Sequence, residues 1–501
     1  MKTKNQSTIT THTPTQNSTE MTYKNTLFST VSISTIIISM KTYFFETYGC
    51  EMNIAESASV EQLFISRGWK KAENAQVADV CVINTCSIRK TAEDRILGRL
   101  GWFSGLKKIR ECKPDAKAKF MDDAVNLVKD GPKPLTIIFM GCMAERLLNS
   151  VKKDWPCIDY VVGTFAKHHF GEIIDAIEEN RPAFQPDDTE EYKFAKTSYE
   201  QGNYEAFVPI MHGCNNFCTY CIVPYLRGRE ISRNADEILQ ELDVLNSYGV
   251  KDVTLLGQNV NSYRGKDSSG NELNFAILLQ KIADHLKETN SKIGWIRFMS
   301  SHPKDFTDDV ISVIAKEEVL CKHIHLPVQN GSTKILKAMN RRYTREQYLE
   351  LAKKIKTQIP DVSLTTDIMM GFPGETEDDV EETLNLMKEI RYESAMMYYY
   401  NPREGTPAAK LEQIPEEIRK SRLQKVIDLQ MIHTEEEMKK QIGRTQKVLV
   451  ESVSRDSPEE LLGKTSRNEK VSFKAEKSLI GKFVQVEILS LNGHTFKGKI
   501  I

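Results

Sequence analysis

The chain has 501 residues, a formal net charge of −1 and ten cysteines. This length is too great for one typical domain, so we expect two to four domains. The near-zero net charge excludes a globally basic nucleic-acid coat, and any contact with RNA must therefore be local. The cysteines are irregularly spaced in a long chain, which does not indicate a disulfide framework and favours a reducing compartment. We expect a cytoplasmic protein.

The first 39 residues are rich in Ser, Thr and Asn and contain few large apolar side chains before Val31. We expect residues 1–39 to be a disordered extension, and Met40 is a candidate for the true start of the protein. The run from Val31 to Met40 is too short to span a bilayer. A secretory signal would need a shorter polar lead and a small-residue cleavage site, so no membrane association is expected.

From Lys41 to about residue 180 the pattern predicts alternating strands and helices. Strands are expected at 42–46, 79–84, 135–140 and 158–162, and helices at 54–66, at 88–100, from Ala144 and from His168. Such alternation is typical of a parallel sheet with helical crossovers. In sheets of this kind, ligands gather beyond the carboxyl ends of the strands.

Three cysteines fall at those carboxyl ends, because Cys50, Cys86 and Cys142 each follow a predicted strand within a few residues. Although 36 and 56 positions separate them in the sequence, the topology should bring them to one rim, where they would form a three-thiolate site. The alternative is that small residues at strand ends merely fit tight turns. Cys81 and Cys157 are expected to be core residues of that ordinary kind.

Two polar segments interrupt this order. A Lys-rich insert with several prolines, residues 101–134, lengthens the loop before Cys142 and is expected to be an excursion with some helix. Cys112 lies in the insert without partner residues, so we leave it out of the site. Residues 180–201 are polar and contain Pro182, Pro186 and an acidic run, which is typical of a linker.

The central region opens on a loop with three closely spaced cysteines: Cys214, Cys218 and Cys221 have the spacing C-x3-C-x2-C. Three thiolates cannot complete a four-thiolate shell, so one iron of a [4Fe-4S] cube would stay open to a substrate or cofactor. The alternative is a zinc knuckle. Zinc sites usually supply four ligands in two pairs, and no C-x2-C or H-x3-H partner lies nearby.

Around this loop the sequence predicts six strand and helix alternations. The strands are expected at 207–211, 252–256, 295–299, 323–326, 364–370 and 395–400, with helices that begin near Ala235, Phe275, Phe306, Thr333 and Thr376. Six units are fewer than the eight of a closed barrel. We therefore expect an open (β/α)6 partial barrel with the cysteine loop on its carboxyl-end rim.

Other rim segments are candidates for a cofactor pocket. Gln258 and Asn259 follow the second strand, Gln329 follows the fourth and Gly371 follows the fifth. Polar side chains there can bond a ribose, and glycine can let the backbone approach an adenine. The alternative is ordinary turns with helix caps. The nearby histidines are expected to be structural rather than metal ligands: His302, His323 and His325.

A helix is expected from Glu416 to about Ile442, and residues 440–501 then show short alternating strands bounded by glycines. This pattern is typical of a small β-barrel. From Gln441 onward the chain has eleven Lys plus Arg and seven Asp plus Glu. A modestly basic small barrel suits a nucleic-acid backbone. A solvated surface without a ligand is the alternative.

The C-x3-C-x2-C motif, with Tyr220 before its last cysteine, resembles the radical S-adenosylmethionine (SAM) superfamily. The order of a three-cysteine α/β domain, a barrel and a basic tail resembles the methylthiotransferases of that superfamily throughout residues 41–501. The resemblance implies an N-terminal domain at 41–180, a radical SAM core at 200–437 and an RNA-binding TRAM domain at 440–501. It also implies SAM and two [4Fe-4S] clusters, the auxiliary one on Cys50, Cys86 and Cys142 and the SAM-binding one on Cys214, Cys218 and Cys221.

Three branches of this family compete. The segments TYGCEMN at 47–53, LGQNVNSY at 256–263 and NPREGTPAA at 401–409 look most like the branch usually called MiaB. Glu51 stands where a glutamine is common, Asn330 stands where a serine is common, and the 101–134 insert is longer than expected. None of these departures touches a predicted cluster ligand. The alternatives are methylthiolation of threonylcarbamoyladenosine in tRNA or of an aspartate in a ribosomal protein.

The MiaB branch implies methylthiolation of carbon 2 of N6-isopentenyladenosine beside the tRNA anticodon. One SAM would give the methyl group, a second would be cleaved to a 5′-deoxyadenosyl radical that removes the hydrogen atom, and the auxiliary cluster would supply sulfur. No catalytic general base is required, and none is nominated. A non-enzymatic iron-sulfur RNA-binding sensor is the alternative.

Several partners follow from that chemistry: the tRNA anticodon loop, an external electron donor such as flavodoxin or ferredoxin, and a sulfur or cluster-repair donor. The protein itself is expected to be a monomer. The target adenosine lies in a single-stranded loop, where a base can be splayed out and held by stacking. The candidate contacts are Tyr398, Tyr399 and Tyr400, although strand alternation places some of them in the core.

Overall fold

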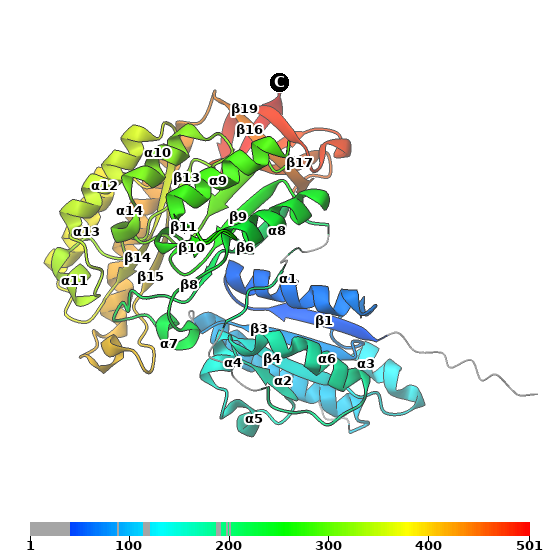
Figure 1. Cartoon of the computed structure of the whole chain (residues 1–501). Coiled ribbons are helices and arrows are strands. Elements are labelled where there is room, and N and C mark those ends of the chain that lie inside the picture. The colour runs from blue at the N-terminus through cyan, green and yellow to red at the C-terminus, as the bar shows by residue number, and fades with distance from the viewer. Residues whose placement is uncertain (1–40, 88–89, 114–120, 187–191, 197–198, 200–201) are drawn as a thin grey trace, which may run out of the picture. The chain divides into compact units, whose positions relative to one another are not determined.

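Three sheet systems follow one another along the chain and belong to one structural unit, Met40–Ile501 (Figure 1). The computed structural model describes residues 41–87, 90–113, 121–186, 192–196, 199 and 202–501. The predicted extension at 1–39 lies outside these residues, as does part of the predicted linker at 180–201.

The first system is a parallel five-stranded sheet with the strand order β2-β1-β3-β4-β5. Its strands are β1 (Thr42–Thr47), β2 (Lys70–Lys71), β3 (Val80–Thr85), β4 (Thr136–Gly141) and β5 (Tyr160–Val162). Strands β3 and β4 are buried almost throughout, which explains their continuous apolar runs. The predicted parallel α/β arrangement is confirmed.

Helices pack on both faces of this sheet, because one hydrophobic cluster includes Phe103 and a second includes Phe64 and Ile173. The helices are α1 (Glu51–Ser66), α2 (Lys90–Arg110), α3 (Asp122–Leu127), α4 (Cys142–Arg146), α5 (Val151–Asp154) and α6 (Phe170–Glu178). Short 3-10 turns occur at η2 (Val128–Asp130) and η3 (Ala166–His169).

The helix expected at 88–100 extends into the predicted insert at 101–134, where some helix was expected. Helix α2 continues to Arg110 because Leu100, Phe103 and Leu106 are buried on one of its faces. Tertiary packing there overrides the helix-weakening effect of Gly98 and Gly101. The middle of the insert, residues 114–120, lies outside the described part of the chain.

The second system contains six parallel strands in two groups, ordered β6-β9-β12 and β13-β14-β15. They are β6 (Glu205–Pro209), β9 (Asp252–Leu256), β12 (Trp295–Phe298), β13 (His323–His325), β14 (Ser363–Met370) and β15 (Ser394–Tyr399). An isolated parallel bridge from Ile296 to Leu320 lies at the junction of the two groups. The predicted open (β/α)6 barrel is confirmed.

Helices follow these strands along the outer side of the barrel (Figure 1). They are α8 (Ala235–Ser247), α9 (Phe275–Glu288), α10 (Asp308–Lys316), α11 (Thr333–Ala338), α12 (Arg345–Gln358) and α13 (Glu377–Ile390). Smaller elements are β7 (Met211–His212), paired with β8 (Ile231–Ser232), and α7 (Val223–Arg227). A hairpin of β10 (Arg264–Lys266) and β11 (Glu272–Asn274) has no counterpart in the sequence-based prediction.

The long helix α14 (Glu416–Lys439) leads to a closed barrel with the order β16-β17-β18-β20-β19. Its strands are β16 (Thr445–Val453), β17 (Glu460–Thr465), β18 (Lys470–Lys474), β19 (Phe483–Asn492) and β20 (Thr495–Ile500), with a 3-10 turn η7 (Lys477–Leu479). Apolar side chains such as Val448, Phe473 and Phe496 fill its interior. The predicted small β-barrel is confirmed.

Buried basic side chains attach this barrel to the central one. Arg297 of β12 donates to the carbonyls of Thr465 (2.8 Å) and Ser466 (2.9 Å), and its Nε lies 2.9 Å from Asp252. Lys464 also reaches Asp252, at 3.1 Å. Part of the positive charge of residues 440–501 therefore serves docking rather than ligand binding.

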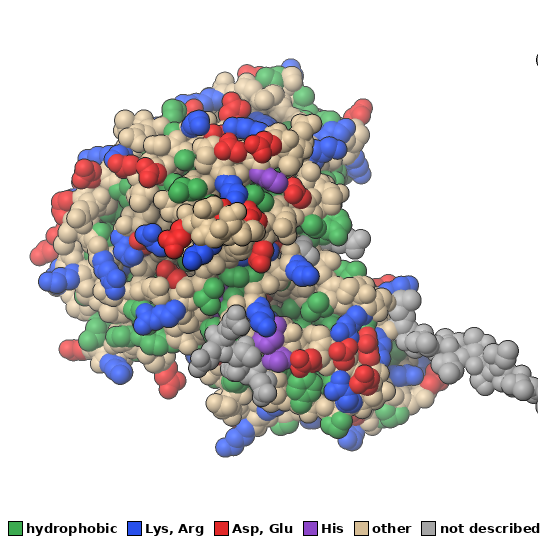
Figure 2. Space-filling model, viewed as in Figure 1, with side chains coloured by type: hydrophobic (Ala, Val, Ile, Leu, Met, Phe, Trp, Pro, Cys, Tyr) green, Lys and Arg blue, Asp and Glu red, His purple; other side chains and the backbone are tan. Residues whose placement is uncertain are grey.

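Charged side chains of both signs are interspersed on the face shown in Figure 2. This mixture agrees with a net charge of −1 and with the expectation that any basic surface is local. Among the residues with a described position, no helix combines the length and apolar composition needed to cross a bilayer.

Candidate active site

Cys50, Cys86 and Cys142 follow β1, β3 and β4, which are neighbours in the sheet. Cys50 is the N-cap residue of α1, and Cys142 is the first residue of α4. Cys86 and Cys142 are buried, whereas Cys50 is half-buried. Burial raises the pKa of Cys50 to about 12, with smaller contributions from the nearby Cys86 and Cys142 thiols. The structure thus places the three predicted cysteines close enough for the charge on one to affect the others.

A buried asparagine pair holds the loops of this rim. Asn53 Nδ2 donates to Asn84 Oδ1 at 2.8 Å, and Asn84 Nδ2 donates to the carbonyl of Asn53 at 2.9 Å. Gly141 has φ +96°, and a Cβ on it would meet Asn84 Oδ1 at 2.4 Å. Only glycine therefore permits β4 to approach this pair and present Cys142 directly after its last residue.

A buried arginine reaches this site from the central barrel. Arg227 Nη2 donates to Cys142 Sγ at 3.2 Å, and Arg227 Nη1 donates to Glu56 Oε1 at 2.8 Å. Lys167 Nζ binds the same carboxylate at 2.8 Å. Burial alone would raise the pKa of Glu56, but Arg227 and Lys167 outweigh it and lower that pKa to about 2. A carboxylate flanked by two cations thus lies beside the cysteine rim.

Cys214, Cys218 and Cys221 lie on the loop after β6 and β7. Burial raises the pKa of Cys214 to about 11 and that of Cys221 to about 12, and the Cys218 thiol contributes to both shifts. The backbone of Cys214 donates to the carbonyl of Gly228 at 3.1 Å. Gly213 has φ +78°, and a Cβ there would meet the Arg229 carbonyl oxygen at 2.0 Å. The loop start therefore requires glycine.

The segment after α11 supports this loop. The backbone of Thr219 donates to the carbonyl of Met339 at 3.1 Å, and Asn340 Nδ2 donates to the carbonyl of Phe217 at 3.0 Å. Arg341 Nη1 donates to Cys218 Sγ at 3.5 Å, and its Nη2 donates to the carbonyl of Pro327 at 2.9 Å. Neither Arg227 nor Arg341 is predictable from the sequence, because no local pattern marks an arginine that will be buried against a thiol.

The four predicted cofactor-pocket residues lie on the carboxyl-end rim segments. Gln258 Oε1, Asn259 Oδ1 and Gln329 Oε1 are buried atoms without hydrogen-bond partners among the described residues. Gln329 adopts φ +71°, an uncommon conformation for a residue other than glycine. Buried polar atoms are normally hydrogen-bonded, so these groups have the capacity to bind a polar ligand.

Packing within the protein gives Gly371 a reason to be glycine besides the one expected from the sequence. It has φ +73°, and a Cβ there would meet Arg419 Cγ of α14 at 2.2 Å. Its N–H donates to Glu375 Oε1 at 2.8 Å. Close packing against α14 therefore requires glycine at this position.

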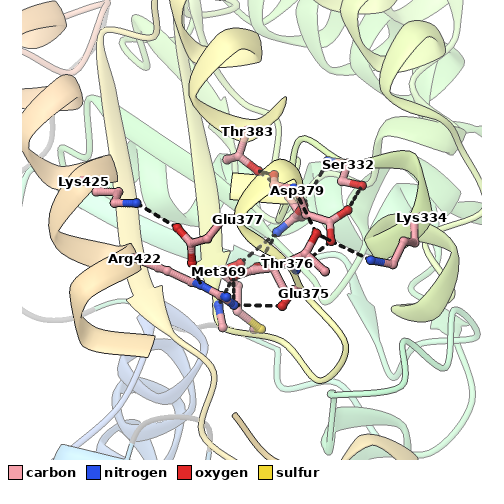
Figure 3. Close-up of polar contacts among 12 residues, drawn as sticks. Ser332, Lys334, Met369, Glu375, Thr376, Glu377, Asp379, Thr383, Arg422 and Lys425 are labelled. Atoms are coloured by element: carbon pink, nitrogen blue, oxygen red, sulfur yellow. Dashed lines mark hydrogen bonds and ion pairs between the residues drawn. The ribbon is translucent and has the colours of Figure 1, made fainter. Parts of the chain in front are cut away.

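Glu375 joins the rim loops that follow β13 and β14 (Figure 3). It accepts from Asn330 Nδ2 at 3.0 Å and from Arg422 Nη1 at 3.2 Å, as well as from Gly371. Burial raises the pKa of Glu375 to about 7, against the lowering effect of these donors. Asn330, which departs from the common serine, is thus a structural hydrogen-bond donor.

Comparisons with known proteins agree with this arrangement. Residues 42–163 match the uncharacterized protein family UPF0004, residues 208–387 the radical SAM superfamily and residues 439–501 the TRAM domain. A tRNA-2-methylthio-N(6)-dimethylallyladenosine synthase of Treponema pallidum is 50% identical over 474 residues, which cover 92% of this chain and 99% of that protein. The chain belongs to this family of synthases. The predicted family and TRAM domain are confirmed, and the chain is a radical SAM enzyme.

Other synthases of the family show the same extent of similarity. The protein of Treponema denticola is 50% identical over 473 residues, covering 92% of this chain and 100% of that protein. The protein of Clostridium botulinum strain Langeland is 40% identical over 482 residues, covering 95% and 100%. Among solved structures, the radical SAM methyltransferase TsrM from Kitasatospora setae shares the fold, with a TM-score of 0.51, 11% identity and 74% coverage of both chains.

The radical SAM domain of this synthase family implies a [4Fe-4S] cluster and SAM. Among the residues placed by the structure, no three His, Cys, Asp or Glu side chains converge on a single ion site. A cluster does not require such convergence, because each thiolate binds a different iron. Each cysteine group offers soft thiolate donors in a desolvated setting beside one arginine, and this donor set fits iron-sulfur ligation.

Proposed function

We propose that this enzyme methylthiolates carbon 2 of N6-isopentenyladenosine next to the anticodon of tRNA, with SAM as methyl donor and radical source. The observation that carries the proposal is the 50% identity to synthases of that name over 92% of the chain. In this proposal the domains are the N-terminal methylthiotransferase domain at 41–180, the radical SAM core at 200–437 and the TRAM domain at 440–501.

Six cysteines are the proposed cluster ligands: Cys214, Cys218 and Cys221 at the SAM-binding cluster, and Cys50, Cys86 and Cys142 at an auxiliary one. When bound, the SAM-binding cluster would supply the electron that cleaves SAM, and the auxiliary cluster would supply the sulfur that is inserted. The contact of Arg227 with Cys142 supports this pairing of sites, because Arg227 follows Cys221 by only six residues. Cys142 also packs in one apolar cluster with Ile222, which follows Cys221 directly, and this contact supports a shared location for the two cysteine groups.

Buried side chains around both sites affect the protonation of the proposed cysteine ligands. Burial raises the pKa of the Cys50, Cys142, Cys214 and Cys221 thiols, so each thiol proton is held more tightly than in an exposed cysteine. Cluster binding must displace those protons. The buried guanidinium groups of Arg227 and Arg341 then stabilise the thiolates by charge-assisted hydrogen bonds.

Gln258, Asn259, Gln329 and Gly371 are the proposed SAM-pocket residues. The first three offer buried amide oxygens that lack partners among the described residues. Such oxygens can accept hydrogen bonds from ribose hydroxyls, from an adenine amino group or from the ammonium group of SAM. Gly371 contributes by its backbone, whose N–H already binds Glu375 and fixes the loop after β14.

The tRNA partner would approach with its anticodon loop, from which a base can be extruded and stacked. Among the three tyrosines considered for this role, Tyr398 is 37% exposed and Tyr399 is half-buried, and both remain candidates. Tyr400 is buried in an apolar cluster with Phe372 and is not a candidate. An external electron donor such as flavodoxin or ferredoxin, a sulfur or cluster-repair donor, a cytoplasmic location and a monomeric state complete the proposal.

Nucleoside analysis tests the proposal. The full chain, reconstituted anaerobically with iron and sulfide, is incubated with SAM, dithionite and a tRNA anticodon stem-loop that carries N6-isopentenyladenosine. We expect the 2-methylthio nucleoside together with 5′-deoxyadenosine and S-adenosylhomocysteine. Stem-loops with threonylcarbamoyladenosine or unmodified adenosine should give no methylthio product. Product only from the threonylcarbamoyl substrate, or no product from any of them, would reject the proposal.

A further inference from the structure

Each cysteine group has one buried arginine that donates a hydrogen bond to one thiol sulfur. Arg227 Nη2 lies 3.2 Å from Cys142 Sγ, and Arg341 Nη1 lies 3.5 Å from Cys218 Sγ. The guanidinium groups come from different elements, α7 and the loop after α11. The two contacts are therefore structurally separate, although each pairs a guanidinium group with a thiol sulfur.

The surroundings of Arg227 hold it against Cys142. Its other nitrogen binds Glu56, whose carboxylate also binds Lys167, so the guanidinium cannot turn away without breaking a buried ion pair. Arg227 Nη1 also lies 3.4 Å from His212 Nδ1. Beside the Cys142 sulfur, two cations thus face one carboxylate.

The surroundings of Arg341 are different. Its Nη2 donates to the carbonyl of Pro327 at 2.9 Å, and its Nε donates to the hydroxyl of Tyr343 at 2.9 Å. Within the described part of the chain, no carboxylate lies at ion-pair distance from Arg341. Neutral acceptors therefore fix its orientation, and the thiol sulfur of Cys218 receives a hydrogen bond from a cation without a counter-charge.

On the basis of the proposed function, we propose that Arg227 and Arg341 are positioning residues that set the reduction potentials of the two clusters independently. Arg227 acts on the auxiliary cluster, and Arg341 acts on the SAM-binding cluster. Each cluster takes up one electron from an external one-electron donor, no proton is transferred, and the cluster with its thiolates becomes more negative by one charge. A nearby cation that donates to a ligand sulfur stabilises that added charge, and the effect is strong in a desolvated site. Each arginine therefore raises the potential of its own cluster.

The test measures both potentials in the full chain by EPR-monitored redox titration. The variants R227M and R341M remove one guanidinium each while they keep a long apolar side chain. Signals are assigned with the full-length variants C50A/C86A/C142A and C214A/C218A/C221A, each of which retains one cysteine group. R110M is the matched control, because Arg110 is buried and donates to the Ala78 carbonyl at the opposite end of the sheet.

We expect R227M to lower the ratio of reduced to oxidised auxiliary cluster at a fixed solution potential by at least tenfold, a shift of about 59 mV for one electron. R341M should do the same to the SAM-binding cluster. Each variant should change the reduced-to-oxidised ratio of the other cluster by less than about twofold. R110M should change neither ratio. Shifts of both clusters together, or of neither, would overturn the proposal.

A change in the opposite direction separates this role from damage to the fold. E56Q removes a negative charge near Cys142 and should raise the reduced fraction of the auxiliary cluster, whereas a loosened site would not produce a rise. R227K retains the charge and should shift the ratio less than R227M. If the unsubstituted chain binds both clusters but makes no methylthio product, only the proposed function fails. If it takes up no cluster at Cys50, Cys86 and Cys142, both proposals fail.

Discussion

Glu93 and Arg403, which are 310 positions apart in the sequence, form a buried ion pair at 3.0 Å. Glu93 lies on α2, the helix after Cys86, and Arg403 lies in the loop after β15 of the central barrel. Arg146, which follows Cys142, binds the same carboxylate at 2.8 Å. One carboxylate thus ties the cysteine rim of the first sheet to a loop of the barrel.

The first prediction concerns this tie. The change E93Q leaves two arginines near a neutral amide, and breaking a buried pair in this way typically costs about 3 kcal/mol. We expect the free energy of unfolding in urea to fall by about that amount. The control is E389Q, whose pair with Arg345 lies at the surface and should contribute less than about 1 kcal/mol. Equal effects of the two changes would contradict the prediction.

The second prediction concerns pH. Burial raises the pKa of Glu375 to about 7 from its model-compound value of 4.5. The folded state therefore binds this proton more tightly than the unfolded state, and the associated stability is present below pH 4.5 and lost as the pH rises toward 7. This shift in the pKa of Glu375 corresponds to about 3 kcal/mol in the free energy of unfolding. Unfolding measured at several pH values should show this loss in the unsubstituted chain and a flatter profile in E375Q.

Asp379 provides the control of opposite sign. Burial raises its pKa, but Lys334, Ser332 and Thr376 outweigh burial and lower that pKa to about 2. The stability that its ionised form contributes is present above about pH 4 and lost as the pH falls toward 2. D379N should therefore destabilise the protein more at pH 7 than at pH 3. The same pH profile for D379N and E375Q would contradict both assignments.

Sequence patterns predicted four of the five strands of the first sheet and all six strands of the central barrel to within two residues. Buried strands such as β3 and β4 carry continuous apolar runs, and Asn234 and Asn274 cap the helices that were expected near Ala235 and Phe275. Neighbouring parallel strands share one rim, so the adjacency of Cys50, Cys86 and Cys142 followed from topology.

What the sequence did not predict depends on contacts between distant residues. Arg227 and the Glu93–Arg403 pair acquire their roles only when the first domain packs against the central barrel. Arg341 acquires its role when distant segments of the central barrel meet, and no local periodicity encodes either kind of contact. The helix expected at 88–100 extends to Arg110, because Phe103 is buried in the core of the first domain. The basic tail was counted as a ligand surface, yet Lys464 is buried in ion pairs with Glu205 and Asp252.

The third prediction separates the two cysteine groups. Changing Cys214, Cys218 or Cys221 to Ala should abolish 5′-deoxyadenosine formation, because these residues are the proposed ligands of the cluster that would cleave SAM. Changing Cys50, Cys86 or Cys142 to Ala should retain 5′-deoxyadenosine while methylthio product falls below detection. Cys321 is buried but lies near Arg297, away from either group, so C321A is the control and should retain both products. Equal loss of 5′-deoxyadenosine in both groups would reject the division of labour.

The fourth prediction concerns the basic residues of the C-terminal barrel. Lys470, Lys482 and Lys499 are exposed, and no carboxylate lies within ion-pair distance of them among the described residues. Each phosphate contact that is removed should weaken tRNA binding and reduce the slope of log K against log salt by about one. We expect K470A/K482A/K499A to lower tRNA affinity roughly tenfold or more at moderate salt, measured by fluorescence anisotropy at several salt concentrations.

The control K497A removes a lysine already paired with Glu460 at 2.6 Å and should change the slope little. SAM cleavage without tRNA should be equal in all these variants, and an unchanged salt slope in the triple variant would exclude these lysines from the tRNA contact.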